Sequence, residues 1–91
     1  MRRPNALKLK TGRMNIVSKR ITLARQEHKP AWTMEALSQA LEERTGLVLS
    51  TGTIGKIEAG IRGVFDYEVV AFAQTLEVDA NWLLGLIDPI A

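Results

Sequence analysis

The stretch from Ser50 to Ala59 carries the side chains with the clearest chemical possibilities. It reads Ser-Thr-Gly-Thr-Ile-Gly-Lys-Ile-Glu-Ala, and helical spacing places Ile54 and Ile57 on one face. Hydroxyl groups and amines can bond base edges in a DNA major groove, and exposed N–H groups at a helix N-terminus can bind phosphate. The stretch therefore predicts a helix suited to nucleic acid. The small or basic residues on its outer face are Thr51, Gly52, Gly55 and Lys56.

Gly52 and Gly55 admit two interpretations. Each glycine costs a helix about 1 kcal/mol relative to alanine. One interpretation is that another backbone approaches closely at these positions, where a side chain would collide. The other is that neighbouring elements hold the helix and tolerate both glycines. These two positions alone leave both interpretations open.

Charge is distributed unevenly along the chain, although its 91 residues carry a formal net charge of only +2. Residues 1–29 contain nine Lys or Arg and one acid, whereas residues 30–91 contain three Lys or Arg and nine acids. One face of the molecule could therefore meet a polyanion. The alternative is that the basic half is a solvated tail.

Residues 1–14 are expected to form a flexible basic arm, and residues 15–91 a single domain. Residues 1–13 contain Pro4 and Gly12 and lack the periodic apolar positions that would repay ordering. The arm could follow a phosphate backbone or enter a minor groove. It could equally be an incidental extension. Its basic residues are Arg2, Arg3, Lys8, Lys10 and Arg13.

An all-α fold of five helices is predicted. Apolar residues recur at helical spacing from residue 15 to about residue 27, and Gly46 and Gly60 mark the ends of two later helices, at 34–45 and 50–59. Four polar residues are expected to cap helix starts, because each follows an apolar residue and precedes another by four positions. These caps are Thr33, Ser50, Asp66 and Asp79.

No residue set indicates catalysis, a metal site or a cofactor. His28 is the only histidine and there is no cysteine, so neither a metal cluster nor a nucleophile–base pair can be assembled. The Gly55-Lys56 pair lacks the following Ser or Thr of a phosphate-binding loop. Glu42 and Glu43 are adjacent and would point about 100° apart on a helix, which does not suit acid–base catalysis.

The apolar runs are too short for a membrane span or a signal peptide. The absence of cysteine agrees with a reducing compartment. We therefore expect a cytoplasmic protein that has no small-molecule ligand.

Several short stretches share the order and spacing of one known family. Residues 54–60 read Ile-Gly-Lys-Ile-Glu-Ala-Gly, residues 33–38 read Thr-Met-Glu-Ala-Leu-Ser, and residues 82–85 read Trp-Leu-Leu-Gly. From Asn15 to about residue 87, the chain resembles the phage-repressor (Cro-type, xenobiotic-response-element) helix-turn-helix transcription regulators. The resemblance implies a lambda-repressor-like DNA-binding domain that reads DNA through the helix at 50–59.

The resemblance also implies roles for particular residues. It places Thr51, Gly52, Gly55 and Lys56 against bases. An arginine late in the first helix pairs with a glutamate of the third helix in this family, which here implies a pair between Arg25 and Glu58. The full set of residues that the resemblance assigns to DNA binding is Thr33, Met34, Ser50, Thr51, Gly52, Thr53, Gly55, Lys56 and Arg62.

The chain departs from the family pattern in three ways. Met34 stands where the family usually has a glutamine that reaches DNA, and methionine offers no useful hydrogen-bond donor. The connection between the second and third helices is lengthened by about six residues, near Glu42 to Leu47. Gly52 and Gly55 replace longer side chains, so direct base reading would fall mainly to Thr51 and Lys56.

The expected function is a sequence-specific repressor that binds double-stranded DNA as a homodimer, on a short palindrome with half-sites about 34 Å apart. An antitoxin whose main partner is a toxin protein is an alternative on the same scaffold. A protein-interaction module that has lost DNA binding is another. The sequence leaves these alternatives open.

Overall fold

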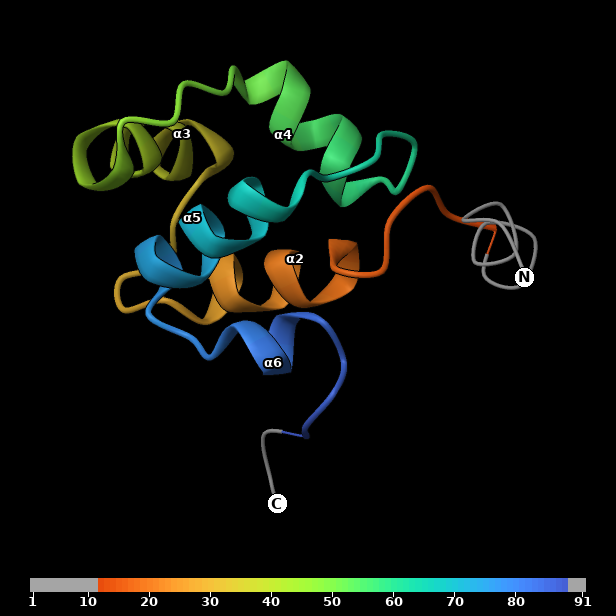
Figure 1. Ribbon diagram of the computed structural model, residues 1–91. Helices are drawn as coiled ribbons and strands as arrows, with labels where there is room; N and C mark the ends of the chain where they lie inside the picture. Colours follow the sequence, from red (N-terminus) through yellow and green to blue (C-terminus); the bar gives the residue numbers. More distant parts are fainter. Residues whose placement is uncertain (1–11, 89–91) are drawn as a thin grey trace.

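The computed structural model describes residues 12–88 of the chain, and these residues contain five α-helices. They are α2 (Ser18–Glu27), α3 (Met34–Thr45), α4 (Thr51–Glu58), α5 (Asp66–Leu76) and α6 (Ala80–Leu83). In Figure 1, α5 crosses the middle of the molecule, with α3 and α4 on one side of it and α2 and α6 on the other. Residues 12–88 contain no strand, and the all-α prediction is confirmed for them.

The core is centred on α5, which packs against α2, α3 and α6. Phe72 is fully buried in α5 and is the largest of the fully buried side chains. Every other helix adds apolar residues at helical spacing to the same cluster. Nowhere in the described part of the chain is a helix both long and apolar enough to cross a membrane. The fully buried aliphatic residues of the other helices are Ile21, Leu37, Leu41, Ile54, Ile57 and Leu83.

Three of the four predicted helix caps are confirmed. The Oγ1 of Thr33 accepts the N–H of Ala36 at 3.0 Å at the start of α3. Ser50 caps α4 and Asp79 caps α6 in the same way, at 3.1 and 2.7 Å. Each side chain satisfies a backbone donor that the helix itself leaves unpaired.

The prediction that Asp66 caps the next helix is wrong. Phe65 occupies the N-cap position of α5, and its N–H donates to Oε1 of Glu68 at 3.0 Å. Glu68 lies three residues into the helix, from where a glutamate can reach back to the cap. Asp66 is instead the first helical residue, which places its charge favourably near the positive end of the helix.

The first described helix starts later than predicted. Sequence periodicity placed the start at Asn15, whereas α2 begins at Ser18. The Oδ1 of Asn15 accepts the N–H groups of Val17 and Ser18, at 3.1 and 2.8 Å. Asn15 therefore lies before the helix and supplies acceptors for its first donors.

The predicted arm falls largely outside the described residues, which start at residue 12. Arg13 and Met14 were assigned to the arm, but both lie against the end of α4. The N–H of Met14 donates to the carbonyl of Gly60 at 2.7 Å. The packed part of the chain thus includes residues that precede the predicted boundary at residue 15.

The lengthened connection predicted near Glu42 to Leu47 divides into two parts. Residues up to Thr45 form the last turn of α3, and Gly46 ends that helix with a φ of 78°. The segment that follows is attached to α3, because Oγ of Ser38 donates to the carbonyl of Leu49 at 2.6 Å. This bond fixes where the chain enters α4.

Thr75 provides a test of the core. Its side chain is 0% exposed, and its Oγ1 has no hydrogen-bond partner within residues 12–88. We expect Thr75→Val to raise the free energy of unfolding by about 1 kcal/mol, because a methyl group replaces an unsatisfied hydroxyl of the same shape. Urea unfolding followed by circular dichroism measures the change.

Thr45→Val is the matched control. The Oγ1 of Thr45 donates to the carbonyl of Leu41 and accepts the N–H of Leu47, at 2.7 and 3.2 Å. The same substitution should therefore lower stability at this position. Equal destabilisation by the two variants would show that Thr75 does find a partner.

Candidate nucleic-acid interface

The outer face of α4 is exposed, as the sequence predicts. Ile54 and Ile57 are fully buried, while Thr51, Gly52 and Lys56 are exposed. Thr53 and Gly55 are half-buried at the edge of this face. The face therefore presents small groups and one cation from a helix whose opposite side is held in the core.

The start of α3 packs beside the middle of α4. A Cβ atom added to Gly55 would lie 3.8 Å from Sδ of Met34, which is ordinary van der Waals contact. Met34 also packs against the core cluster. The structure thus brings these two predicted site residues together, and Met34 acts as a spacer between the helices.

Gly52 faces open space. The nearest atom to a Cβ added there would be Oγ of Ser50, at 3.8 Å. Neither Gly52 nor Gly55 is therefore required by close packing within the described chain. The close approach that would favour glycine at these positions must come from a partner, or else both glycines are tolerated.

The hydroxyl groups at the start of α4 differ in how they are used. The Oγ of Ser50 accepts the N–H of Thr53 and donates to its Oγ1, at 3.1 and 3.0 Å. The hydroxyl of Thr51 makes no hydrogen bond within the described chain. Thr51 is thus the hydroxyl of this face with its full bonding capacity available to a partner.

Arg62, one of the predicted DNA-binding residues, is bound to a buried carboxylate. Its Nη1 and Nη2 donate to Oε1 and Oε2 of Glu68, at 3.0 and 3.1 Å. The Glu68 side chain is only 3% exposed. Burial alone would raise the pKa of Glu68, but the hydrogen bonds from Arg62 and from the N–H of Phe65, together with the Arg62 charge, lower it overall.

The predicted pair between Arg25 and Glu58 is present. Nε and Nη2 of Arg25 donate to Oε2 and Oε1 of Glu58, at 2.8 and 2.9 Å. Thr22 adds a bond to Oε1 at 2.9 Å, and the Glu58 side chain is 5% exposed. The hydrogen bonds with Glu58 raise the pKa of Arg25. These contacts tie the end of α4 to the face of α2.

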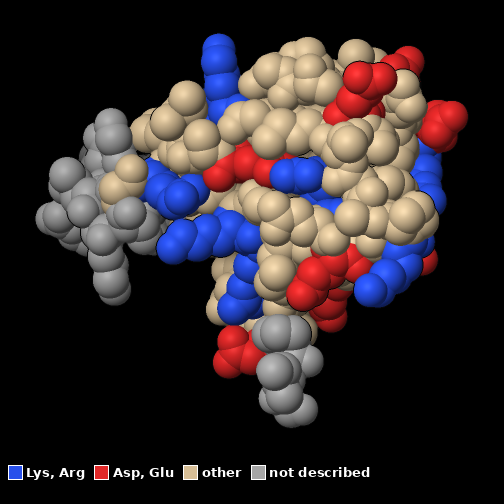
Figure 2. Space-filling model, turned by 180° about the vertical axis from the view of Figure 1, so that it is seen from behind, with Lys and Arg blue, Asp and Glu red and all other residues tan. Residues whose placement is uncertain are grey.

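Most cations in the described residues are used within the molecule. Arg20 donates to the carbonyls of Trp82 and Ile87, at 2.6 and 2.8 Å, and Arg44 donates to the carbonyl of Thr75 at 2.8 Å. Figure 2 shows Lys and Arg side chains gathered on the side where the described chain begins. The lysines that make no hydrogen bond or ion pair within residues 12–88 are Lys19, Lys29 and Lys56.

The local charge of the α4 face is consequently small. Lys56 is the lysine on that helix, whereas the first turn of α3 adds an acid, Glu35. No three His, Cys, Asp or Glu side chains between residues 12 and 88 are grouped so that they could hold a metal ion.

Comparison with known proteins returns no match for this chain among protein-family models, curated proteins or solved structures. The interpretation of the interface therefore depends on the geometry of α3 and α4 and on the chemistry of the exposed residues.

Sequence reasoning missed one residue that holds the candidate site. The Nδ2 of Asn15 donates to the carbonyls of Ile57 and Arg62, at 3.1 and 2.9 Å. Its sequence signal is the ordinary preference of asparagine for positions near helix starts. Nothing local to Asn15 indicates the bonds to residues more than forty positions away.

Glu68 gives the site a predictable dependence on pH. A carboxyl whose pKa is lowered by folding stabilises the native state above its unfolded pKa, and this contribution is lost as pH falls through the folded value. Wild type should therefore lose stability below about pH 4.5, the ordinary glutamate value. Glu68→Gln lacks this contribution. The difference in the free energy of unfolding between wild type and this variant should therefore shrink between neutral pH and about pH 3.

Urea unfolding at several pH values measures that difference. Glu43→Gln is the control, because Glu43 is exposed and makes no hydrogen bond within the described chain. A difference for Glu68→Gln that stays constant down to about pH 3 would contradict the assigned ion pair.

Gly52→Ala should stabilise the protein. The position is helical and open, so alanine should add up to about 1 kcal/mol through helix propensity alone. Gly46→Ala is the matched control and should destabilise, because Gly46 has a φ of 78° that alanine adopts with strain. Thermal unfolding distinguishes the two, and a destabilised Gly52→Ala would mean that the space beside Gly52 is filled.

Proposed function

We propose that this chain is a sequence-specific regulator that binds double-stranded DNA, with α3 and α4 as a helix-turn-helix of the lambda-repressor-like type. The observation that carries the proposal is the exposed face of α4, which presents small groups while the helix is held from behind by Glu58 and by two buried isoleucines. A reading helix needs both an accessible face and a fixed position.

The residues of this face divide by the contact they would make. The Thr51 hydroxyl and the Lys56 ammonium group make no hydrogen bond within residues 12–88, and each could bond a base edge. Gly52 would let the helix backbone approach the floor of the groove closely. Thr33 and Ser50 cap their helices and would turn the N-terminal ends of α3 and α4 toward phosphates.

The chemistry of the face favours modest direct base reading. With one cation on α4, few phosphates can be neutralised by this helix, and each such contact contributes about 0.9 to the slope of log affinity against log salt. A steep measured slope would therefore have to come from residues outside α4. Specificity would draw on DNA shape as well as on base contacts.

The regulator would act as a homodimer that represses by occupying a short palindrome. Two copies related by a two-fold axis would place their α4 helices about 34 Å apart, one turn of the DNA helix. A promoter overlapped by such a site would be closed to polymerase without any chemical step on the part of this protein.

A second candidate function is binding to a protein partner, such as the toxin of a toxin–antitoxin pair. Large apolar side chains are exposed in the segments that flank α4 in the chain and in the first half of α5, where the rings of Phe65 and Tyr67 stack at 5.5 Å. Exposed apolar groups of this kind favour protein contacts. Size-exclusion chromatography tests this candidate, because a stable complex of this chain with its protein partner should elute as one species. The exposed residues are Val48, Ile61, Phe65, Tyr67 and Val70.

Selection of bound sequences from random DNA tests the main proposal. Wild type should enrich a two-fold symmetric sequence, and Lys56→Ala should bind that sequence about tenfold more weakly. Fluorescence anisotropy at two salt concentrations measures both the affinity and the salt slope.

Lys19→Ala is the matched control for Lys56→Ala. It removes the same charge from a lysine that lies beside the turn after α6. Its affinity should stay within about twofold of wild type, since it removes no contact of α4. If wild type binds scrambled DNA as tightly as any selected sequence, the proposed function is wrong.

A further inference from the structure

Residues 13–15, here called the strap, cross the C-terminal end of α4. The Nη1 of Arg13 donates to the carbonyl of Glu58 at 3.2 Å, and the N–H of Met14 donates to the carbonyl of Gly60 at 2.7 Å. Asn15 donates from Nδ2 to the carbonyl of Ile57 at 3.1 Å. The strap therefore supplies donors to three carbonyls around the end of one helix.

The donor of Arg13 reaches the last carbonyl of α4, that of Glu58, and Asn15 adds a second bond to the carbonyl of Ile57. The last carbonyls of a helix have no partner within the helix, and unpaired backbone groups are costly when they lie away from water. The chain after α4 satisfies some of these carbonyls, since the N–H of Gly60 donates to the carbonyl of Ile57 and the N–H of Ile61 donates to the carbonyl of Lys56. The strap completes the set, and the charge of Arg13 suits the negative end of the helix.

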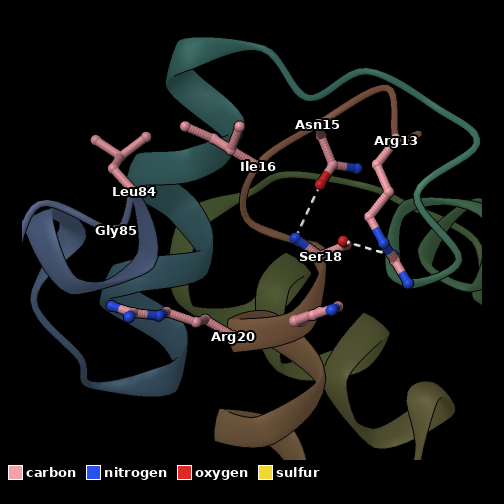
Figure 3. Close-up of a pocket in the computed structure, with 8 residues that line it drawn as sticks. Arg13, Asn15, Ile16, Ser18, Arg20, Leu84 and Gly85 are labelled. Carbon is pink, nitrogen blue, oxygen red and sulfur yellow. Dashed lines mark hydrogen bonds between the residues drawn. The ribbon is translucent and has the colours of Figure 1, made fainter. Parts of the chain in front are cut away.

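Asn15 joins α2 to the end of α4, as Arg13 also does through Ser18 and Glu58. Its Oδ1 accepts the first donors of α2, while its Nδ2 bonds the carbonyls of Ile57 and Arg62. Because the side-chain amide is planar and rigid, one group sets the distance between the start of α2 and the end of α4. Figure 3 shows Asn15 and Arg13 both directed toward Ser18, the first residue of α2.

Among the residues that the structure describes, the strap is packed against the loop after α4. Arg13 lies directly on Gly60, where an added Cβ would come within 2.7 Å of Nη1. On the other side, a hollow of about 550 Å³ separates the strap from the turn after α6, with Ile16 and Leu84 at its edge (Figure 3). Hydrogen bonds, not surrounding side chains, therefore hold much of the strap in place.

Several residues attach α4 to α2, and Arg13 is one of them, since it bonds both the carbonyl of Glu58 and Oγ of Ser18, at 3.2 and 2.8 Å. Arg25 binds the Glu58 side chain, whereas Asn15 binds backbone carbonyls at the helix end. A helix held at one point can pivot about it. For a helix of eight residues, about 12 Å long, a pivot of about 5° moves the far end by about 1 Å, enough to disturb hydrogen bonds to bases.

We infer that Asn15 is a positioning residue for the proposed DNA-reading helix, and that its amide sets the angle at which α4 meets DNA. This inference rests on the proposed function. Asn15 is not among the residues proposed to contact DNA. Its loss should therefore reduce the preference for the selected sequence and leave non-specific affinity and the salt slope unchanged.

Asn15→Ser and Asn15→Asp separate the two tasks of the side chain. Serine and aspartate are both good acceptors for the first N–H groups of α2, so the start of that helix is kept. The Asn15 amide donates to the carbonyls of both Ile57 and Arg62, whereas serine has a single O–H donor and ionised aspartate has none and places a negative charge against them. We expect the ratio of selected to scrambled DNA affinity to fall about tenfold for Asn15→Ser and further for Asn15→Asp.

Leu76→Ala is the control for a general loss of stability. Leu76 is buried in α5, and its truncation weakens the core without changing surface charge or the end of α4. This variant should keep the wild-type affinity ratio under conditions where it is folded. A fall in the ratio equal to that of Asn15→Ser would show that any destabilisation has the same effect, and would overturn the inference.

Amide hydrogen exchange reports on the strap independently of DNA. In Asn15→Ser, exchange at Ala59, Gly60 and Ile61 should accelerate at least about tenfold, while exchange in the middle of α2 stays at the wild-type rate. Unchanged exchange at these three amides would overturn the positioning role, whatever the DNA result.

The outcomes also separate this inference from the proposed function. If wild type selects no DNA sequence, the proposed function fails and the DNA part of the inference fails with it. If wild type selects a sequence and Asn15→Ser keeps the same preference, the proposed function stands and the inference alone is wrong.

Discussion

The arrangement of the helices depends on one buried carboxylate. Glu58 ends α4 with a side chain that is 5% exposed, and Arg25 and Thr22 on α2 supply the hydrogen bonds that it needs. An unpaired charge in such a place would cost several kcal/mol. The two helices must therefore stay together, which holds the exposed face of α4 in a fixed position relative to α2.

The same solution recurs at Arg62 and Glu68, with consequences for the surface. Glu68 is buried as it caps α5, and Arg62 is held against it. With Arg20 and Arg44 bonded to carbonyls elsewhere, the described arginines serve mainly to join elements of the fold. Within residues 12–88 the positive charges of Arg25 and Arg62 are thus offset by buried carboxylates.

The sequence predicted what local rules govern and missed what distant contacts decide. Apolar spacing and three of the four caps located the helices, since both depend on residues within one or two turns. Asp66 was predicted to cap α5, because the capping rule does not distinguish between two nearby acids. In the structure it is the Glu68 carboxylate that accepts the N–H of Phe65 at the start of the helix. The bonds of Asn15 to the end of α4 and the ion pair between Arg62 and Glu68 depend on how separate elements pack together. No local sequence pattern predicts such contacts.

The strap also bears on the order in which the molecule folds. Its bond from Arg13 to the carbonyl of Glu58 joins residues 45 positions apart, so closing it costs considerable chain entropy. Such a contact gains free energy only after α2 and α4 have already met through Arg25. The earliest described residues in the chain are therefore expected to be among the last to reach their final place, and α4 is completed by residues that the ribosome made well before it.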